Sequence, residues 1–386
     1  GTAAGTHELT GIAGAAATGA GLFPSDLTAY DGKVLFSGYD AKGDIGLWMT
    51  DGTAAGTHEL AVAGALATSQ GVLPAGLSPS DLTVYNGHVF FSGDDASGGV
   101  GLWETDGTAS GTHELTGIAG AATRGQGIGP PGLSPSDLTL YDGQILFSGD
   151  DARGQTGLWE TDGTVSGTKE LTGIAGALTA GIGLDPSNLT AYNGELLFSG
   201  DGANGQNGLW ETDGTATGTK ELTGIAGAQA GIGLEPSDLT VLNGRVLFRG
   251  YDSSGRVGLW ETDGTAAGTH ELTGIAGAAT TGLGLLPSDL TVSNGEALFN
   301  GIASSGHDQL WETDGSAAGT HPLTVAGAAP TGLNPAQLAA IGTAPTPTPP
   351  AIGTATTPPN FFNSDDKADI LWQNANGDVE LWNSSS

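Results

Sequence analysis

Carboxylate side chains in glycine-rich segments are the groups of this sequence best suited to chemistry. Asp94 and Asp95 follow one short apolar run, and Asp150 and Asp151 follow another at the equivalent place. Ca²⁺ prefers about six to eight oxygen ligands, which carboxylates and backbone carbonyls can supply. The spacing of these residues differs from that of an EF-hand loop. They are therefore weak candidate Ca²⁺ ligands, with a solvated acidic loop as the alternative, and we expect no other cofactor.

Tryptophan recurs within the string Leu-Trp-x-Thr-Asp-Gly, where x is Glu or Met. Indole rings can stack on sugars, so a lectin has to be considered. Each of these tryptophans lies in the middle of an apparent strand and follows a Leu that faces the opposite side, which favours packing inside the fold. We expect structural roles for all six: Trp48, Trp103, Trp159, Trp210, Trp260 and Trp311.

The Asp of the Thr-Asp-Gly string lies where the chain leaves the tryptophan segment. Asp followed by Gly is typical of a turn in which the carboxylate accepts hydrogen bonds from nearby amides. We expect this structural role for Asp106, Asp162, Asp213 and Asp263.

Catalytic signatures are missing from the sequence. A carboxylate repeated in every copy differs from a catalytic pair, which needs one asymmetric arrangement with separated pKa values. One repeat position holds His in five copies, for example His113, and Lys in two, for example Lys169. A metal or catalytic ligand would not tolerate Lys in this way. GxSxG, HExxH and nucleotide-binding strings are absent too. We therefore expect no enzyme.

The spacing of the tryptophans defines a repeat. Successive tryptophans from Trp48 to Trp311 are 55, 56, 51, 50 and 51 residues apart. A period near fifty residues is typical of four-stranded propeller blades and exceeds that of ankyrin or tetratricopeptide repeats.

Each repeat predicts four short strands. In one copy these are residues 239–242, 246–248, 258–262 and 269–273. Asn-Gly or Asp-Gly joins the first two strands of six copies, and these dipeptides favour a type I′ hairpin turn. The strand centres are apolar at consecutive positions, which indicates burial on both faces. The sequence therefore predicts an all-β protein, a β-propeller of four-stranded blades.

The blade count depends on the two ends of the chain. Residues 1–9 match a fourth strand without a blade, whereas residues 338–341, 369–372 and 379–382 match the first three strands of a blade. Pairing the ends gives a ring of seven blades, closed by the N-terminal strand. The alternative is six blades and a detached tail. The expected domains are propeller repeats over 1–342, a Pro/Thr-rich linker or insertion over 343–360, and a segment over 361–386 that completes the last blade.

Charge and composition exclude several classes of partner. The 386 residues carry a formal net charge of −32, with no cysteine. Such an acidic chain repels nucleic acids and anionic lipid surfaces, and no apolar run is long enough to span a membrane. Because the chain starts at Gly1 inside a repeat, we expect it to be part of a longer protein.

Two resemblances to known repeats extend these expectations. Residues 258–269 read GLWETDGTAAGT and resemble the ELWxxDGTxxGT repeat of large secreted bacterial proteins. The string NSDDKADILW at 363–372 resembles an FG-GAP or VCBS-type repeat, which normally holds Ca²⁺. This second resemblance implies Asn363, Asp365 and Asp369 as metal ligands.

The sequence leads to one functional expectation and two alternatives. We expect a non-catalytic, secreted or cell-surface propeller that presents loops for binding or adhesion to an extracellular glycan or protein. The first alternative is a multivalent carbohydrate-binding lectin. The second is a lyase or hydrolase on the propeller face.

Overall fold

The computed structural model describes residues 8–18, 21–66, 75–123, 132–324, 335–341, 369–373 and 379–383. The chain divides into two compact units, one of Leu9–Thr223 and one of Gly1–Glu8 with Gly224–Ser386. Every regular element in the described residues is a β-strand. None of those residues forms a helix long and apolar enough to cross a bilayer.

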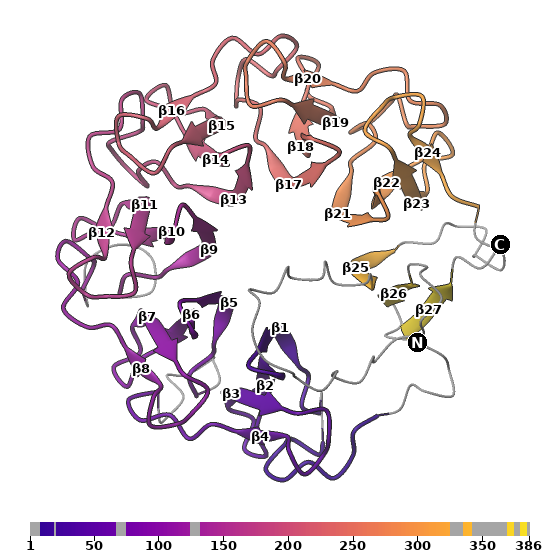
Figure 1. Cartoon of the computed structure of the whole chain (residues 1–386). Coiled ribbons are helices and arrows are strands. Elements are labelled where there is room, and N and C mark those ends of the chain that lie inside the picture. The colour runs from indigo at the N-terminus through magenta and orange to yellow at the C-terminus, as the bar shows by residue number, and fades with distance from the viewer. Residues whose placement is uncertain are drawn as a thin grey trace, which may run out of the picture. The chain divides into compact units, whose positions relative to one another are not determined.

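The unit of residues 9–223 contains four antiparallel sheets of four strands, which we call blades 1 to 4 (Figure 1). Blade 1 comprises β1 (Ser25–Tyr30), β2 (Lys33–Tyr39), β3 (Ile45–Thr50) and β4 (His58–Glu59). Blade 2 comprises β5 (Ser80–Tyr85), β6 (His88–Asp94), β7 (Val100–Thr105) and β8 (His113–Glu114). Blade 3 comprises β9 (Ser136–Tyr141), β10 (Gln144–Asp150), β11 (Thr156–Thr161) and β12 (Lys169–Glu170). Blade 4 comprises β13 (Ser187–Tyr192), β14 (Glu195–Asp201), β15 (Asn207–Thr212) and β16 (Lys220–Glu221).

The other unit contains blades 5 and 6 and one further sheet of three strands. Blade 5 comprises β17 (Ser237–Leu242), β18 (Arg245–Tyr251), β19 (Val257–Thr262) and β20 (His270–Glu271). Blade 6 comprises β21 (Ser288–Ser293), β22 (Glu296–Ile302), β23 (Asp308–Thr313) and β24 (His321–Pro322). The three-stranded sheet comprises β25 (Ala336–Ile341), β26 (Asp369–Gln373) and β27 (Val379–Asn383).

These sheets confirm the predicted all-β propeller of four-stranded blades. Within the first unit the inner strands β1, β5, β9 and β13 lie side by side, and the two-residue strands β4, β8, β12 and β16 lie on the opposite side (Figure 1). Residues 1–7, which hold most of the expected closing strand, are outside the described residues. Closure into a ring of seven blades therefore stays a prediction.

Hairpin turns and bulges shape the inner strands. In the β1–β2 turn, Asp31 and Gly32 have φ angles of 47° and 72°, and residues of these two types tolerate such left-handed backbone. The pairing of β1 with β2 shifts register between Ser25 and Thr28, where Asp26 has a φ of 52°. The same bulge recurs at the start of the other inner strands of blades 2 to 6.

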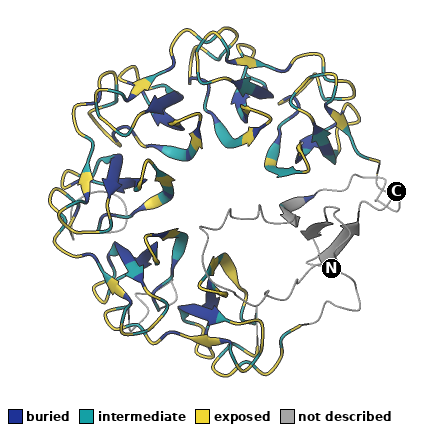
Figure 2. Ribbon diagram, in the orientation of Figure 1, coloured by how far each residue is buried: buried dark blue, intermediate teal, exposed yellow. Residues whose placement is uncertain are grey.

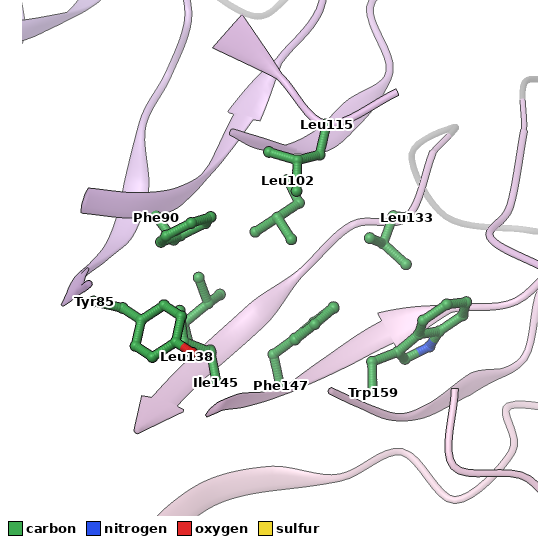
Figure 3. Close-up of a cluster of buried hydrophobic side chains, with 9 residues drawn as sticks. All are labelled: Tyr85, Phe90, Leu102, Leu115, Leu133, Leu138, Ile145, Phe147 and Trp159. Carbon is green, nitrogen blue, oxygen red and sulfur yellow. The ribbon is translucent and has the colours of Figure 1, made fainter. Parts of the chain in front are cut away.

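The apolar cores lie between consecutive blades. Tyr85 and Phe90 of blade 2 pack against Ile145, Phe147 and Trp159 of blade 3, together with four leucines (Figure 3). The middle strands of each blade are the most buried, and the connecting loops are the most exposed (Figure 2). Because each blade buries both faces, its middle strands are apolar at consecutive positions.

Side chains also join consecutive inner strands. The Thr83 hydroxyl of β5 donates to the Leu138 carbonyl of β9 at 2.9 Å, and the Thr139 hydroxyl of β9 donates to the Leu189 carbonyl of β13 at 3.2 Å. In the second unit, Thr291 donates to the carbonyl of Leu338 at 2.9 Å. Consecutive blades are therefore connected by hydrogen bonds as well as by apolar contact.

Candidate functional site

A pocket in the described residues lies at the outer edge of blade 3. Its volume is about 540 Å³. The β10–β11 turn, the start of β11, Glu170 of β12 and the connection to blade 4 surround it. Leu158, Ile174 and Leu184 supply apolar wall, while Asp151, Glu170 and Gln155 supply polar groups. Apolar walls with a few convergent polar groups are typical of small-molecule sites.

Glycine sets the position of the Glu170 carboxylate. Glu170 pairs with Trp159 across the sheet, and its side chain extends along β11 over Gly157. A Cβ atom on Gly157 would meet the Glu170 carboxylate, so the absence of a side chain there creates the space that Glu170 fills. Burial and the nearby Asp151 carboxylate raise the pKa of Glu170, whereas Arg153 lowers it. The pocket is therefore a place where positive charge is stabilised.

Asp151 begins the β10–β11 turn, and the turn holds its side chain in place. Its Oδ1 atom accepts hydrogen bonds from the backbone N–H groups of Arg153 at 2.8 Å and Gln155 at 2.9 Å. Asp151 is buried and Arg153 is exposed. The turn thus places one carboxylate in the wall of the pocket and one guanidinium-bearing residue at its exposed rim.

Blade 5 has the same pocket at the same place, with a volume of about 210 Å³. Asp252 and Glu271 correspond to Asp151 and Glu170. Here Arg256 crosses the space: its Nε atom is 3.6 Å from Asp252 Oδ2, and its Nη1 donates to the Thr280 carbonyl at 2.6 Å. A guanidinium from the chain itself therefore occupies the position that Gln155 leaves more open in blade 3.

Carboxylate pairs of this type recur beside the second-to-third strand turn. The pKa values of Glu59, Glu114 and Glu271 are raised, first by burial and then by the Asp of the neighbouring turn. The Asp partners are Asp40, Asp95 and Asp252. In blade 4 a glycine, Gly202, replaces the Asp.

The four Asp residues predicted as Ca²⁺ ligands do not point to a common centre. Asp95, like Asp151, caps its own turn, accepting N–H groups of Ser97 and Gly99 at 2.7 and 2.8 Å. Asp94 bonds instead to the Ser78 side chain, and Asp150 accepts the Thr156 hydroxyl at 2.8 Å. No group of three or more potential ligands gathers in the described part of the chain. Calcium binding stays a prediction.

The remaining predicted residues divide into described and undescribed ones. The carboxylates of Asp106, Asp162, Asp213 and Asp263 each accept the N–H and the hydroxyl of the Thr two residues later, at 2.6–3.0 Å. These hydrogen bonds lower the pKa of all four carboxyls, the Thr hydroxyl contributing most. Asn363 and Asp365 lie outside the described residues, and Asp369 is the first residue of β26.

The six tryptophans are buried, with at most 1% of their surface exposed. Each stacks on a Phe of the preceding strand, as Trp210 does on Phe198 with ring centroids 6.1 Å apart. Each indole N–H donates to a glycine carbonyl, for example Trp210 Nε1 to Gly200 at 2.9 Å. None of the six presents an exposed ring face to a sugar.

A row of carboxylates on the inner strands was missed at the sequence level. Asp81 Oδ2 accepts the N–H of Asp137 at 3.2 Å, and Asp137 Oδ2 accepts the N–H of Asn188 at 2.9 Å. Burial raises the pKa values of Asp26, Asp81 and Asp137, which line a pocket of about 370 Å³. The repeated Ser-Asp-Leu-Thr string is the signal that could have identified them.

The repeat position shared by His and Lys forms ion pairs on the surface. Lys169 is 2.9 Å from Glu160, Lys220 is 2.7 Å from Glu211, and His113 is 3.0 Å from Glu104. The Lys and His side chains are more than half exposed, so each contact adds little to stability.

Comparisons with known proteins identify the fold alone. No protein-family model and no curated protein matches the chain. A solved structure similar to it is the β-propeller domain of the Trilobed protease from Pyrococcus furiosus, with 10% identity, coverage of 94% of this chain and 96% of that one, and a TM-score of 0.47. A puromycin-hydrolyzing peptidase of Mycobacterium tuberculosis is 12% identical, with coverage of 92% of this chain and 52% of that one and a TM-score of 0.49. A putative TolB from Agrobacterium tumefaciens is 12% identical, with coverage of 63% of this chain and 78% of that one and a TM-score of 0.36. The chain thus spans about half the length of the mycobacterial peptidase.

These matches correct the functional expectation. These similar structures are the β-propeller domain of a protease, a puromycin-hydrolyzing peptidase and a putative TolB, and none of them is described as an adhesin or a lectin. The expectation of an extracellular adhesion propeller, and the lectin alternative, were therefore wrong. At 10–12% identity, the likeness carries no activity over to this chain.

Proposed function

We propose that this protein is a propeller domain that binds a small guanidinium or ammonium compound in the pocket of blade 3, without transforming it. The ligand would place its cationic group between the carboxylates of Asp151 and Glu170. Its aliphatic part would lie along Leu158, Ile174 and Leu184. The arginine side chain and its simple derivatives have this chemistry.

Arg256 is the observation that carries this proposal. In blade 5 its guanidinium lies between the Asp252 carboxylate and the Thr280 carbonyl, in a pocket built from the same elements. Blade 3 keeps the equivalent acceptors, Asp151 and Thr179, but has Gln155 where blade 5 has Arg256. The chain therefore contains, in blade 5, an internal example of the ligand that blade 3 would take from solution.

The charges and dimensions of the pocket agree with such a ligand. Its volume of about 540 Å³ lies in the range of about 300–1,000 Å³ that small-molecule sites occupy. Burial raises the pKa of Glu170 by disfavouring its charged form, and a bound cation would offset this effect. The net charge of −32 would also draw cations toward the surface.

Binding without catalysis is part of the proposal. The Asp and Glu pair recurs in blades 1, 2, 3 and 5, whereas catalysis requires one asymmetric set of groups. Secretion or display at the cell surface stays an expectation from the sequence.

The test is a calorimetric titration of the full chain with Nα-acetylarginine methyl ester. Nα-acetylcitrulline methyl ester, which carries no cationic group, is the ligand control. Gln155→Arg should abolish the binding, because the new side chain can occupy the pocket as Arg256 does. Arg256→Gln should add a second site in blade 5, because it vacates the equivalent space.

Gln206→Arg is the matched control, since it adds the same charge at the equivalent position of blade 4, where Gly202 replaces the Asp. Binding should survive this change. Equal affinity of wild type and Gln155→Arg would refute the site. Release of an acid or alcohol from the ester during the titration would refute the non-catalytic role and favour a hydrolase.

A further inference from the structure

A tyrosine hydroxyl connects consecutive blades at the hairpin of their inner strands. Tyr30, Tyr85 and Tyr141 end β1, β5 and β9, and each hydroxyl donates to the carbonyl of the hairpin glycine of the next blade, at 2.5, 2.6 and 2.5 Å. We call this hydrogen bond the latch. The acceptors are Gly87, Gly143 and Gly194.

Blade 5 makes its latch with a different residue. Leu242 takes the place of the tyrosine and is buried in the core shared with blade 6. The next residue, Asn243, supplies the hydrogen bond: its Nδ2 donates to the Gly295 carbonyl at 2.8 Å and to the Asp314 carbonyl at 3.3 Å. Asn243 is thus the side chain that latches blade 5 to blade 6 at this hairpin.

Asn243 is followed by Gly244, and this dipeptide carries a reaction of its own. We propose that Asn243 is a deamidation site whose conversion releases the latch between blades 5 and 6. The Gly244 backbone nitrogen would attack the Asn243 side-chain carbonyl carbon, closing a succinimide ring and releasing ammonia. Water then opens one of the two imide bonds, leaving aspartate or isoaspartate. The net change consumes one water and turns an amide into a carboxylate.

The conversion removes the Asn243 Nδ2 donor of the latch. A carboxylate offers acceptors alone, and the two oxygens facing it, those of Gly295 and Asp314, are acceptors as well. Aspartate is harmless at the equivalent turns of blades 1 and 3, where Asp31 and Asp142 stand, because the tyrosine before each of them makes the latch. Among blades 1, 2, 3 and 5, whose latches the structure describes, the effect is therefore specific to blade 5.

The latch also slows the deamidation of Asn243. Asn86, Asn193 and Asn294 form Asn-Gly turns at the same position of other blades and are exposed, as is Asn243. The Asn243 amide is held on two carbonyls of blade 6, so its carbon reaches the Gly244 nitrogen only after the latch opens. We expect Asn243 to react more slowly than Asn86, and its conversion to trap the separated state.

Three variants of the full chain test the release of the latch. Asn243→Asp should raise hydrogen exchange in residues 293–296 and 313–316 by roughly five- to tenfold, as expected for the loss of one hydrogen bond, and lower the melting temperature. Asn86→Asp is the matched control, because Tyr85 makes the latch of blade 2. Leu242→Tyr combined with Asn243→Asp recreates the Tyr141-Asp142-Gly143 sequence of blade 3 and should restore the protection.

Peptide mapping by mass spectrometry after mildly alkaline incubation tests the reaction itself. Conversion should appear first at Asn86 and later at Asn243, and subdenaturing urea should accelerate Asn243 more than Asn86. No conversion at Asn243 once Asn86 is fully converted would overturn the modification site. If hydrogen exchange in residues 293–296 and 313–316 is the same in Asn243→Asp as in Asn86→Asp, the role of Asn243 as a latch is overturned.

Discussion

Replacing Trp210 by Ala should lower the free energy of unfolding far more than a surface substitution would. Trp210 is completely buried in β15, stacked on Phe198 with an interplanar angle of 22°. Truncating such a side chain costs about 3–5 kcal/mol of unfolding free energy. The indole N–H also satisfies the Gly200 carbonyl, and leaving a buried acceptor without its donor costs about 1–3 kcal/mol. These costs overlap, so we expect a loss at the upper end of about 3–5 kcal/mol.

Trp210→Phe separates the two contributions, because it keeps an aromatic ring but removes the N–H donor. Its cost should be about 1–3 kcal/mol, mostly from the Gly200 carbonyl. Urea unfolding followed by circular dichroism gives both values, and the slope of the transition shows whether the blades unfold together. An unfolding free energy within about 0.5 kcal/mol of wild type for Trp210→Ala would refute the packing role.

Three further changes test other parts of the molecule. Burial raises the pKa of Asp137, so the ionised carboxylate opposes folding. Asp137→Asn should therefore raise the melting temperature at neutral pH. This gain should disappear as the pH falls through the raised pKa, because the wild-type carboxyl is then neutral too. Asn188→Asp should lower the melting temperature at neutral pH. A change of the same sign in both variants would contradict this explanation. Millimolar Ca²⁺ should raise the melting temperature more than NaCl of equal ionic strength, and Asp94→Asn with Asp95→Asn should reduce the difference; identical curves in both salts would reject specific calcium sites. Deleting residues 1–9 should lower the melting temperature and promote oligomers by exposing a strand edge, whereas an unchanged monomer would refute closure of the last blade.

Elements that depend on residues close together in the sequence, such as hairpin turns and middle strands, could be predicted from the sequence. Asn-Gly and Asp-Gly located the hairpins because few other dipeptides accept left-handed backbone at both positions. The apolar runs located the middle strands, although β18 extends from Arg245 to Tyr251, beyond its predicted core of residues 246–248. The fourth strands are shorter than predicted: β20 has only His270 and Glu271, since pairing stops where the chain turns toward the next blade.

Features that depend on two blades or on space left by glycine could not be predicted. The latch joins residues more than fifty positions apart, and a tyrosine or an asparagine serves equally well as its donor. The placement of Glu170 over Gly157 requires knowing which strands pair and in which register. The pocket of blade 3 differs from that of blade 5 through Gln155 and Arg256, and both residues are ordinary turn residues in the sequence.

The hydrogen bonds between inner strands give blades 2, 3 and 6 two unlike sides. Blade 2 accepts the Thr28 hydroxyl through the Leu82 carbonyl and donates the Thr83 hydroxyl to the Leu138 carbonyl of blade 3. Contacts of this head-to-tail kind add copies in one direction, as monomers add to a polymer, until the series closes on itself. A duplicated gene segment that encodes one whole blade would therefore supply both a donor side and an acceptor side that fit the neighbouring blades. The number of blades can change by such steps without any new interface having to evolve.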